Sequence, residues 1–286
     1  MGYSQLPNLS VTGKNGVAYA YRDTGGTGAV LLLLQHFRGN LDNWDPALVD
    51  ALGSGRRVLT FDNVGVGGSS GATPSTVAAM ARGALAFVDA LGLDRLDMLG
   101  FSIGSFVAQE IALTRPDLVD RLVLASAAPE GADGMHGWPT EVMDAVGKPV
   151  NSPEGYLDVF FTQSAQSRSA GSAALGRMFS RTQDRDAPTT WDTRLAQYDA
   201  VCAWGVPNHA LLQRLTTIDI PVFVANGDSD PMIRPRYSHL LAGLIPGSRL
   251  KIYPDSAHGF LWQHHVEFAA DVVEFLGGPA SSTMAR

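Results

Sequence analysis

Hydrophobic and polar positions follow two patterns along most of the chain, and these patterns predict alternating strands and helices. Short, predominantly apolar runs have the length of strands, and residues 29–34, which are continuously apolar, are expected to form a strand buried on both faces of a parallel sheet. These runs are residues 29–34, 57–61, 96–99, 122–125, 221–227 and 250–253. Between them, apolar residues recur at the helical spacing, most clearly in residues 75–91, 103–114, 237–244 and 263–276. Strands that alternate with helices predict an α/β fold, with a mostly parallel central sheet flanked by helices.

The two ends of the chain depart from this alternation. Residues 9–21 predict two short strands joined at residues 13–16, where Asn15 and Gly16 favour a hairpin turn. We expect this hairpin at an edge of the sheet. Residues 277–286 are small and polar, and they predict a frayed tail.

The alternation stops between about residue 129 and residue 215. This stretch is rich in glycine and proline, and it includes the polar run at residues 164–169. It contains no apolar run of strand length and only short helical patches, at residues 156–161 and 191–202. Because the stretch is too long for a plain loop, we expect a helical cap over one end of the sheet. The predicted division is a core of residues 1–129 and 216–286, with a cap of residues 130–215.

The first candidate for chemistry is Ser102, at the centre of a Gly-x-Ser-x-Gly pattern in residues 100–104. A predicted strand leads into this pattern and a predicted helix follows it. A sharp turn from strand to helix exposes the serine Oγ at its apex, and glycines relieve the crowding there. The pattern alone is also compatible with a tight turn and a capping serine.

Two further groups follow later predicted strands. Asp230 comes after residues 221–227, and His258 comes after residues 250–253. The carboxyl ends of parallel strands meet at one edge of a sheet, so these side chains can converge on Ser102. Acyl transfer needs such a nucleophile, a base and an acid that orients the base. Asp228, Asp255 and Glu130 compete for the role of the acid.

With these motifs in this order, the chain resembles the α/β-hydrolase superfamily, in its cap-bearing serine esterase and lactonase branch. The matching segments are the nucleophile turn at residues 100–104, a glycine turn at 62–69, an acid loop at 227–231 and a histidine loop at 256–258. The resemblance implies that Ser102 is the nucleophile, His258 the general base and Asp230, which precedes a proline, the acid.

The resemblance also implies an oxyanion hole of two backbone amides. Ile103, next to the nucleophile, is expected to supply one of them. Relatives usually show His-Gly-x-x-Gly after the first central strand, whereas residues 35–39 read Gln-His-Phe-Arg-Gly here. Aligning on Gly39 makes Phe37 the second donor, which we prefer, and aligning on His36 makes it Arg38. In the preferred register His36 occupies a glycine position, where it either contacts substrate, adds a donor or merely packs.

The predicted cap is rich in aromatic residues and methionine, which would suit an apolar acyl or lactone substrate. The same side chains could equally form the small core of the cap. The residues in question are Met135, Trp138, Tyr156, Phe160, Phe161, Met178, Phe179 and Trp204. Together with His36, the candidate substrate contacts are Trp138, Phe161 and Trp204.

Composition excludes several classes of protein. The chain of 286 residues carries a formal charge of −7, which disfavours nucleic acid or an anionic membrane as a partner. Its single cysteine excludes an intrachain disulfide and a cysteine metal cluster. No apolar run reaches membrane-spanning length and the first residues do not resemble a signal peptide, so we expect a cytoplasmic protein. Neither a metal nor a cofactor is expected, and formation of a homodimer stays open.

The resulting hypothesis is a hydrolase that cleaves a carboxylic ester or lactone, a small-molecule substrate, through an acyl-enzyme at Ser102. Relatives use the same three groups for cofactor-free perhydrolysis, for haloperoxidase-like activity and for hydrolysis of carbon–carbon bonds, and these remain alternatives. A hypothesis of another class is a non-catalytic protein that binds a small ligand on the same fold.

Overall fold

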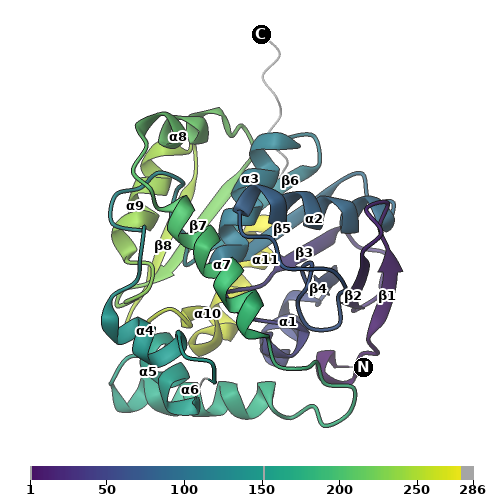
Figure 1. Ribbon diagram of the computed structural model, residues 1–286, viewed down its shortest axis with the longest axis horizontal. Helices are drawn as coiled ribbons and strands as arrows, with labels where there is room; N and C mark the ends of the chain where they lie inside the picture. The colour runs from purple at the N-terminus through teal and green to yellow at the C-terminus, as the bar shows by residue number, and fades with distance from the viewer. Residues whose placement is uncertain (1, 151, 278–286) are drawn as a thin grey trace.

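The computed structural model describes residues 2–150 and 152–277, and its centre is a twisted sheet of eight strands (Figure 1). The strands are β1 (Leu9–Thr12), β2 (Ala18–Asp23), β3 (Val30–Leu34), β4 (Arg57–Phe61), β5 (Leu96–Phe101), β6 (Val119–Ala125), β7 (Val222–Gly227) and β8 (Arg249–Tyr253). Their order in the sheet is β1-β2-β4-β3-β5-β6-β7-β8. The pairs β1–β2 and β2–β4 are antiparallel, and all other pairs are parallel. The predicted fold class is therefore confirmed.

Burial along the strands explains why the hydrophobic pattern was informative. Every residue of β5 and of β7 is buried, as expected for strands in the middle of a sheet that is covered on both faces. β1, in contrast, forms the edge and is largely exposed. The predicted hairpin between β1 and β2 is present, and Gly16 in its turn has a φ of 78°, a conformation that glycine adopts without strain.

Helices cover both faces of the sheet. Figure 1 shows α2 and α3, which pack against each other, in front of the sheet, and α11 behind it. The helix α1 packs against α11. The helices are α1 (Pro46–Leu52), α2 (Val77–Ala90), α3 (Ile103–Thr114), α4 (Thr140–Val146), α5 (Pro153–Phe160), α6 (Ala165–Met178), α7 (Trp191–Trp204), α8 (His209–Arg214), α9 (Pro235–Leu244), α10 (Phe260–Gln263) and α11 (His265–Gly277), with 3₁₀ turns at Tyr3–Gln5, Leu41–Asn43 and Leu215–Thr217.

The stretch between β6 and β7 is helical wherever the structure describes it in regular elements, which are α4 to α8. Figure 1 shows α4, α5 and α6 grouped below the sheet beside α10, while α7 crosses in front of it. We call residues 130–215 the cap segment; that it forms a separate domain stays a prediction. Apart from Gly277, the predicted tail lies outside the described residues.

One sequence-based assignment in the cap segment is wrong. Residues 164–169 looked irregular, yet they begin the 14-residue helix α6. Ser164 is its N-cap, because its hydroxyl oxygen accepts a hydrogen bond of 3.0 Å from the backbone N–H of Ser167. The apolar positions of α6 are few, so no helical period was visible. The helices α4 and α8, which are only seven and six residues long, also escaped detection.

None of the helices in the described part of the chain combines the length and the apolar character that spanning a membrane requires. The longest, α2, α6 and α7, have 14 residues each. A span needs about 20 predominantly apolar residues.

The turn from β5 into α3 depends on two glycines. A Cβ added at Gly104 would overlap the backbone carbonyl group of Leu34 in β3. A Cβ at Gly100 would overlap the first turn of α3 itself. These glycines let α3 start directly on the surface of the sheet, so that Ser102 lies between β5 and α3 with no intervening loop.

We predict that Gly104→Ala lowers the free energy of unfolding by about 1–3 kcal/mol, because the backbone of β3 must move to admit the methyl group. Gly176→Ala in α6 is the matched control, since nothing lies within 4 Å of the added methyl group. That change should raise stability by up to about 1 kcal/mol through helix propensity. Urea unfolding measures both. Equal changes in the free energy of unfolding of the two variants would contradict the close approach of Gly104 to the backbone of Leu34.

Candidate active site

Three side chains from three loops at the carboxyl edge of the sheet form a hydrogen-bonded line. Ser102 follows β5, Asp230 follows β7 and His258 follows β8. The Nε2 atom of His258 lies 2.9 Å from Ser102 Oγ, and its Nδ1 atom lies 2.7 Å from Asp230 Oδ2. All three residues are at most 3% exposed. We call this group the Ser-His-Asp cluster; its burial protects both hydrogen bonds from competition by water.

Ser102 has the unusual backbone that a sharp strand-to-helix turn requires. Its φ of 57° is positive, which is uncommon for a residue with a Cβ atom. The backbone N–H of Ser102 donates to the carbonyl of Ala125 at the end of β6, so the turn is tied to the neighbouring strand. A strained residue held in this way at a cleft is typical of functional sites.

Asp230 is oriented by its own loop. Its Oδ1 atom accepts hydrogen bonds from the backbone N–H groups of Met232 and Ile233, at 2.8 and 2.9 Å. Since one carboxylate oxygen is held by the backbone, the other faces the imidazole of His258 in a defined direction. The carboxylate therefore fixes the ring with its proton on Nδ1 and leaves Nε2 to accept a proton from Ser102.

The three competing acids have other partners. The carboxylate of Asp228 accepts the backbone N–H of Asp255 at 2.9 Å and braces the histidine loop. Asp255 itself accepts hydrogen bonds from hydroxyl groups of the cap segment. Glu130 forms an ion pair with Arg214 at 3.0 Å. In the described structure Asp230 is thus the carboxylate that contacts the imidazole.

The backbone of His258 is held as firmly as its ring. Its carbonyl oxygen accepts a hydrogen bond of 3.1 Å from the buried hydroxyl of Ser126. Its N–H donates to the carbonyl of Val159, and the N–H of Gly259 donates to the carbonyl of Phe160. The last two carbonyls belong to α5 in the cap segment.

Two backbone N–H groups find no acceptor among the described residues: that of Ile103, directly after Ser102, and that of Phe37 in the loop after β3. Ile103 is the first residue of α3, where no intrahelical acceptor exists. The N–H of Arg38 is already used, because it donates to Gln197 Oε1 at 2.6 Å. The hydrogen bonds therefore favour the sequence register in which Phe37, and not Arg38, is the second oxyanion donor.

His36 has both ring nitrogens engaged. Its Nδ1 lies 2.8 Å from the carbonyl oxygen of Phe37, and its Nε2 lies 2.9 Å from the hydroxyl of Tyr156. A carbonyl only accepts, so the network assigns the ring proton to Nδ1 and makes Nε2 the acceptor. Burial, together with a smaller effect of the nearby His258, lowers the pKa of His36 to about 3. A neutral His36 has no donor left for an oxyanion, so that sequence-based option is excluded.

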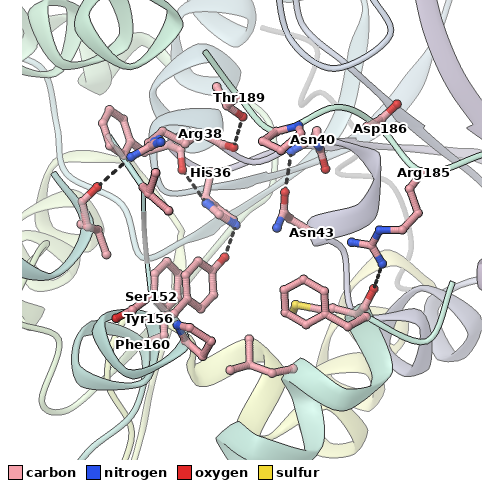
Figure 2. Close-up of a pocket in the computed structure, with 18 of the residues that line it drawn as sticks. His36, Arg38, Asn40, Asn43, Ser152, Tyr156, Phe160, Arg185, Asp186 and Thr189 are labelled. Atoms are coloured by element: carbon pink, nitrogen blue, oxygen red, sulfur yellow. Dashed lines mark hydrogen bonds between the residues drawn. The ribbon is translucent and has the colours of Figure 1, made fainter. Parts of the chain in front are cut away.

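A cavity of about 880 Å³ opens beside the Ser-His-Asp cluster and reaches His258 (Figure 2). At one end His36, Tyr156 and Phe160 stand together, and their rings are 4.1–6.1 Å apart. The other end is polar. Polar residues in its lining are Asn40, Asn43, Arg181, Thr182, Arg185 and Asp186, and the guanidinium of Arg185 lies over the ring of Phe179.

The predicted aromatic wall is only partly correct. Tyr156, Phe160, Met178, Phe179 and His36 do line the cavity. The cavity does not include Trp138, Phe161 and Trp204, contrary to the sequence-based expectation, because each fills space elsewhere. They pack on Phe37, Trp262 and Phe106, respectively. Met135, also expected in the wall, is buried in the hydrophobic core.

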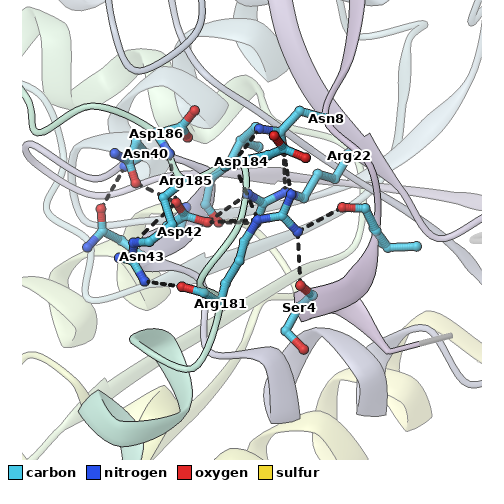
Figure 3. Close-up of polar contacts among 12 residues, drawn as sticks. Ser4, Asn8, Arg22, Asn40, Asp42, Asn43, Arg181, Asp184, Arg185 and Asp186 are labelled. Carbon is cyan, nitrogen blue, oxygen red and sulfur yellow. Dashed lines mark hydrogen bonds and ion pairs between the residues drawn. The ribbon is translucent and has the colours of Figure 1, made fainter.

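The polar end of the cavity was not anticipated, because its residues belong to no motif and come from distant segments. A network shown in Figure 3 holds them. Arg22 and Asp42 form a buried ion pair of 2.6 Å, and Asp42 also accepts the backbone N–H of Asp186 at 2.8 Å. Arg181 donates to the carbonyl of Ser4 at 2.9 Å. These contacts fasten the segment between α6 and α7 to the first strands of the sheet.

Residues suited to binding a metal ion do not gather anywhere in residues 2–150 and 152–277. No group of three or more histidine, cysteine, aspartate or glutamate side chains is placed to hold one there.

Comparison with known proteins matches residues 29–265 to the family described as alpha/beta hydrolase fold. An alpha/beta hydrolase fold protein from Chitinophaga pinensis is 38% identical, with a TM-score of 0.92 over 98% of this chain and 100% of that chain. A putative carbamate hydrolase RutD from Caulobacter sp. (strain K31) is 29% identical over 83% of this chain and 87% of its own length. The enol-lactonase from Burkholderia xenovorans LB400 shares the fold, with a TM-score of 0.76, 23% identity and coverage of 95% of this chain and 100% of that chain.

The depressed pKa of His36 predicts a pH dependence of stability. Its unfolded value is near 6.5, so the advantage of burying the neutral ring is complete above about pH 6.5 and is lost as the pH falls toward 3. In that window His36 should contribute a slope of up to about 1.4 kcal/mol per pH unit. Urea unfolding between pH 7.5 and 4.5 should therefore show a steeper decline for the natural protein than for His36→Asn. Parallel curves would mean that His36 is not held neutral.

Proposed function

Because the chain belongs to the α/β-hydrolase fold family, we propose that it is a serine hydrolase that cleaves a carboxylic ester or a lactone through an acyl-enzyme at Ser102. The observation that carries the proposal is the buried hydrogen-bonded line from Ser102 Oγ through His258 to Asp230. A hydroxyl, an imidazole and a carboxylate in this order are the parts that acyl transfer requires.

In the proposed mechanism, His258 Nε2 accepts the proton of Ser102 as Oγ attacks the substrate carbonyl. Asp230 stabilises the imidazolium through Nδ1. The oxyanion of the tetrahedral intermediate accepts hydrogen bonds from the N–H groups of Phe37 and Ile103. The imidazolium then protonates the leaving alkoxide, which departs as an alcohol or, for a lactone, stays attached to the acyl group. Water then attacks the acyl-enzyme and gives a proton to His258, which passes it to Ser102 Oγ as the bond to the acyl group breaks and the acid is released.

The cavity supports an amphiphilic substrate. Its volume of about 880 Å³ accommodates more than a short ester, since pockets for drug-sized molecules span about 300–1,000 Å³. The aromatic end with Tyr156 and Phe160 suits an apolar acyl or ring portion. The polar end with Asn43, Arg185 and Asp186 suits a group that both donates and accepts hydrogen bonds.

A second candidate is hydrolysis of a carbamate, which the similarity to a putative carbamate hydrolase favours. The same mechanism applies, because a carbamate carbonyl is attacked in the same way and also develops an oxyanion. The neighbouring nitrogen makes that carbonyl less electrophilic, so a carbamate demands more from the oxyanion hole.

The remaining sequence-based alternatives have less support. Perhydrolysis, haloperoxidase-like activity and carbon–carbon bond hydrolysis would use the same Ser-His-Asp cluster, and no described residue favours them over ester cleavage. A protein that only binds a ligand has no need of a strained Ser102 aligned with His258 and Asp230, so we place it last.

We predict that a fluorophosphonate labels Ser102 with one molecule per chain and abolishes esterase activity. Ser102→Ala should not react and should lose about 10³-fold or more of kcat, because the nucleophile is gone. Mass spectrometry of the labelled peptide and a p-nitrophenyl ester assay measure the two effects. A folded natural protein that resists the label would support the ligand-binding hypothesis.

The same assay decides between substrate classes. A panel of p-nitrophenyl esters of increasing chain length, lactones and aryl carbamates compares kcat/KM values directly. The proposal expects esters or lactones to exceed carbamates of similar size by about tenfold or more. The reverse order would favour the second candidate.

Asp230→Asn should lower kcat by about 10³–10⁴-fold, because an amide no longer stabilises the imidazolium and favours the wrong tautomer. Asp228→Asn is the matched control, since an amide oxygen can still accept the backbone N–H of Asp255. That variant should keep kcat within about threefold of the natural value. Steady-state kinetics with one ester give kcat for both variants. A larger loss of kcat in Asp228→Asn than in Asp230→Asn would mean that Asp228 is the acid that orients His258.

A further inference from the structure

The loop that carries Phe37 is attached to the cap segment along most of its length. We call residues 35–40 the oxyanion loop. The hydroxyl of Thr189 donates to the carbonyl of Arg38 at 2.5 Å, and Asn40 Nδ2 donates to the carbonyl of Ala187 at 3.2 Å. The guanidinium of Arg38 donates to backbone carbonyls at residues 146, 148 and 149, with distances of 2.6–3.3 Å. The core alone therefore does not determine the shape of this loop.

Two further contacts hold the peptide group that follows Phe37. Its carbonyl oxygen accepts a hydrogen bond from His36 Nδ1 at 2.8 Å, and its N–H, which belongs to Arg38, donates to Gln197 Oε1 at 2.6 Å. Arg38 has a φ of 62°, a conformation that costs energy in a residue with a Cβ atom and persists only when neighbours impose it. The N–H of Phe37 belongs to the preceding peptide, so we expect a shift of this peptide to move the Cα of Phe37 and with it that N–H, the proposed oxyanion donor.

The hold of His36 on that carbonyl depends on Tyr156. With the Tyr156 hydroxyl donating to Nε2 at 2.9 Å, the ring must carry its proton on Nδ1, which is the atom facing the carbonyl (Figure 2). Without that hydroxyl, the ring loses one of its two hydrogen bonds and can turn away from the carbonyl oxygen, which weakens the hydrogen bond from Nδ1. Tyr156 lies in α5, and Gln197 lies in α7.

The helix α5 contacts the other half of the site as well. The carbonyls of Val159 and Phe160, at its C-terminal end, accept the backbone N–H groups of His258 and Gly259 at 3.3 and 2.8 Å. The ring of Phe160 packs 5.2 Å from the imidazole of His258 and 5.4 Å from that of His36. One short helix thus contacts both the oxyanion loop and the histidine loop.

We propose that the cap segment completes the oxyanion hole, with Tyr156, acting through the His36 imidazole, and Gln197 as positioning residues for the N–H of Phe37. This inference rests on the proposed function of Ser102 as nucleophile. Its consequence is that the transition state is stabilised only while α5 and α7 are docked on the core. Docking of the cap segment over a bound substrate and assembly of the oxyanion hole are then the same event.

The test compares Tyr156→Phe, Gln197→Met and Tyr237→Phe. The first two should lower kcat by about 10-fold to 100-fold, with KM changed by less than about threefold. The reason is that the N–H of Phe37 would bind the oxyanion, which develops only in the transition state and is absent from the bound substrate. Tyr237→Phe is the matched control. It also removes a hydroxyl that donates to a backbone carbonyl, that of Asp133 at 2.9 Å, but one outside both loops. Its kinetics should equal those of the natural protein.

A double variant distinguishes positioning from general damage to the structure. In His36→Asn, the side-chain amide can donate to the carbonyl of Phe37 without help from Tyr156. Adding Tyr156→Phe to His36→Asn should therefore cause no further loss of kcat. If Tyr156→Phe merely damaged the structure, the double variant would have a lower kcat than His36→Asn. Affinity for an alkyl boronic acid, a mimic of the tetrahedral intermediate, should fall in parallel with kcat/KM in both single variants.

Nitrogen-15 NMR of the histidine rings provides an independent readout. His36 should show the Nδ1-protonated form in the natural protein, and its Nδ1 signal should shift in Tyr156→Phe as the hydrogen bond to the carbonyl weakens. Unchanged kcat in Tyr156→Phe and Gln197→Met, together with fluorophosphonate labelling at Ser102, would overturn this inference and leave the proposed function standing. Failure of the natural protein to react with the fluorophosphonate would overturn both.

Discussion

The imidazole of His258 is the group on which the arrangement of the site depends, because it joins loops that follow three different strands. One ring nitrogen contacts Ser102, which follows β5, and the other contacts Asp230, which follows β7. His258 itself follows β8. Each of these hydrogen bonds is short and buried, so a small shift of any strand would break one of them. The parallel order of β5, β6, β7 and β8 brings the three loops to one edge of the sheet at the required spacing.

The imidazole of His36 is also buried, but its partners differ from those of His258. His36 lies in an aromatic environment with Phe101, Phe160 and Trp262, which lowers its pKa and keeps it neutral. A neutral ring has one donor and one acceptor, and here each has a partner. Two histidines that both lie beneath the cavity thus differ in chemistry because of their partners: a carboxylate and a hydroxyl for His258, a carbonyl and a phenol for His36.

Much of the fold and part of the site could be predicted from sequence. The strand β3 is a continuous apolar run and β4, β5 and β7 are predominantly apolar because these strands are largely buried, and their positions were predicted to within a few residues. Ser102, Asp230 and His258 lie in short motifs directly after predicted strands, and the resemblance to a known family gave each of them its expected role. The helix α6 was missed, since small and polar residues dominate it and it is held by its cap and its contacts with α10 and α5.

The alternation of strands and helices and the strained turn at Ser102 follow from the sequence, because each depends on residues that are close together along the chain. The motifs also single out Asp230 and His258, but these residues lie 28 and 156 positions from their partners and meet only through the assembled sheet. Folding in three dimensions likewise sets the packing of Trp138, Phe161 and Trp204 away from the cavity and the contact of His36 with Tyr156. The physical reason is that a side chain's partners across 100 or more residues are set by how helices of the cap segment pack on the core. That packing responds to volume and shape, which leave no periodic signal in the sequence.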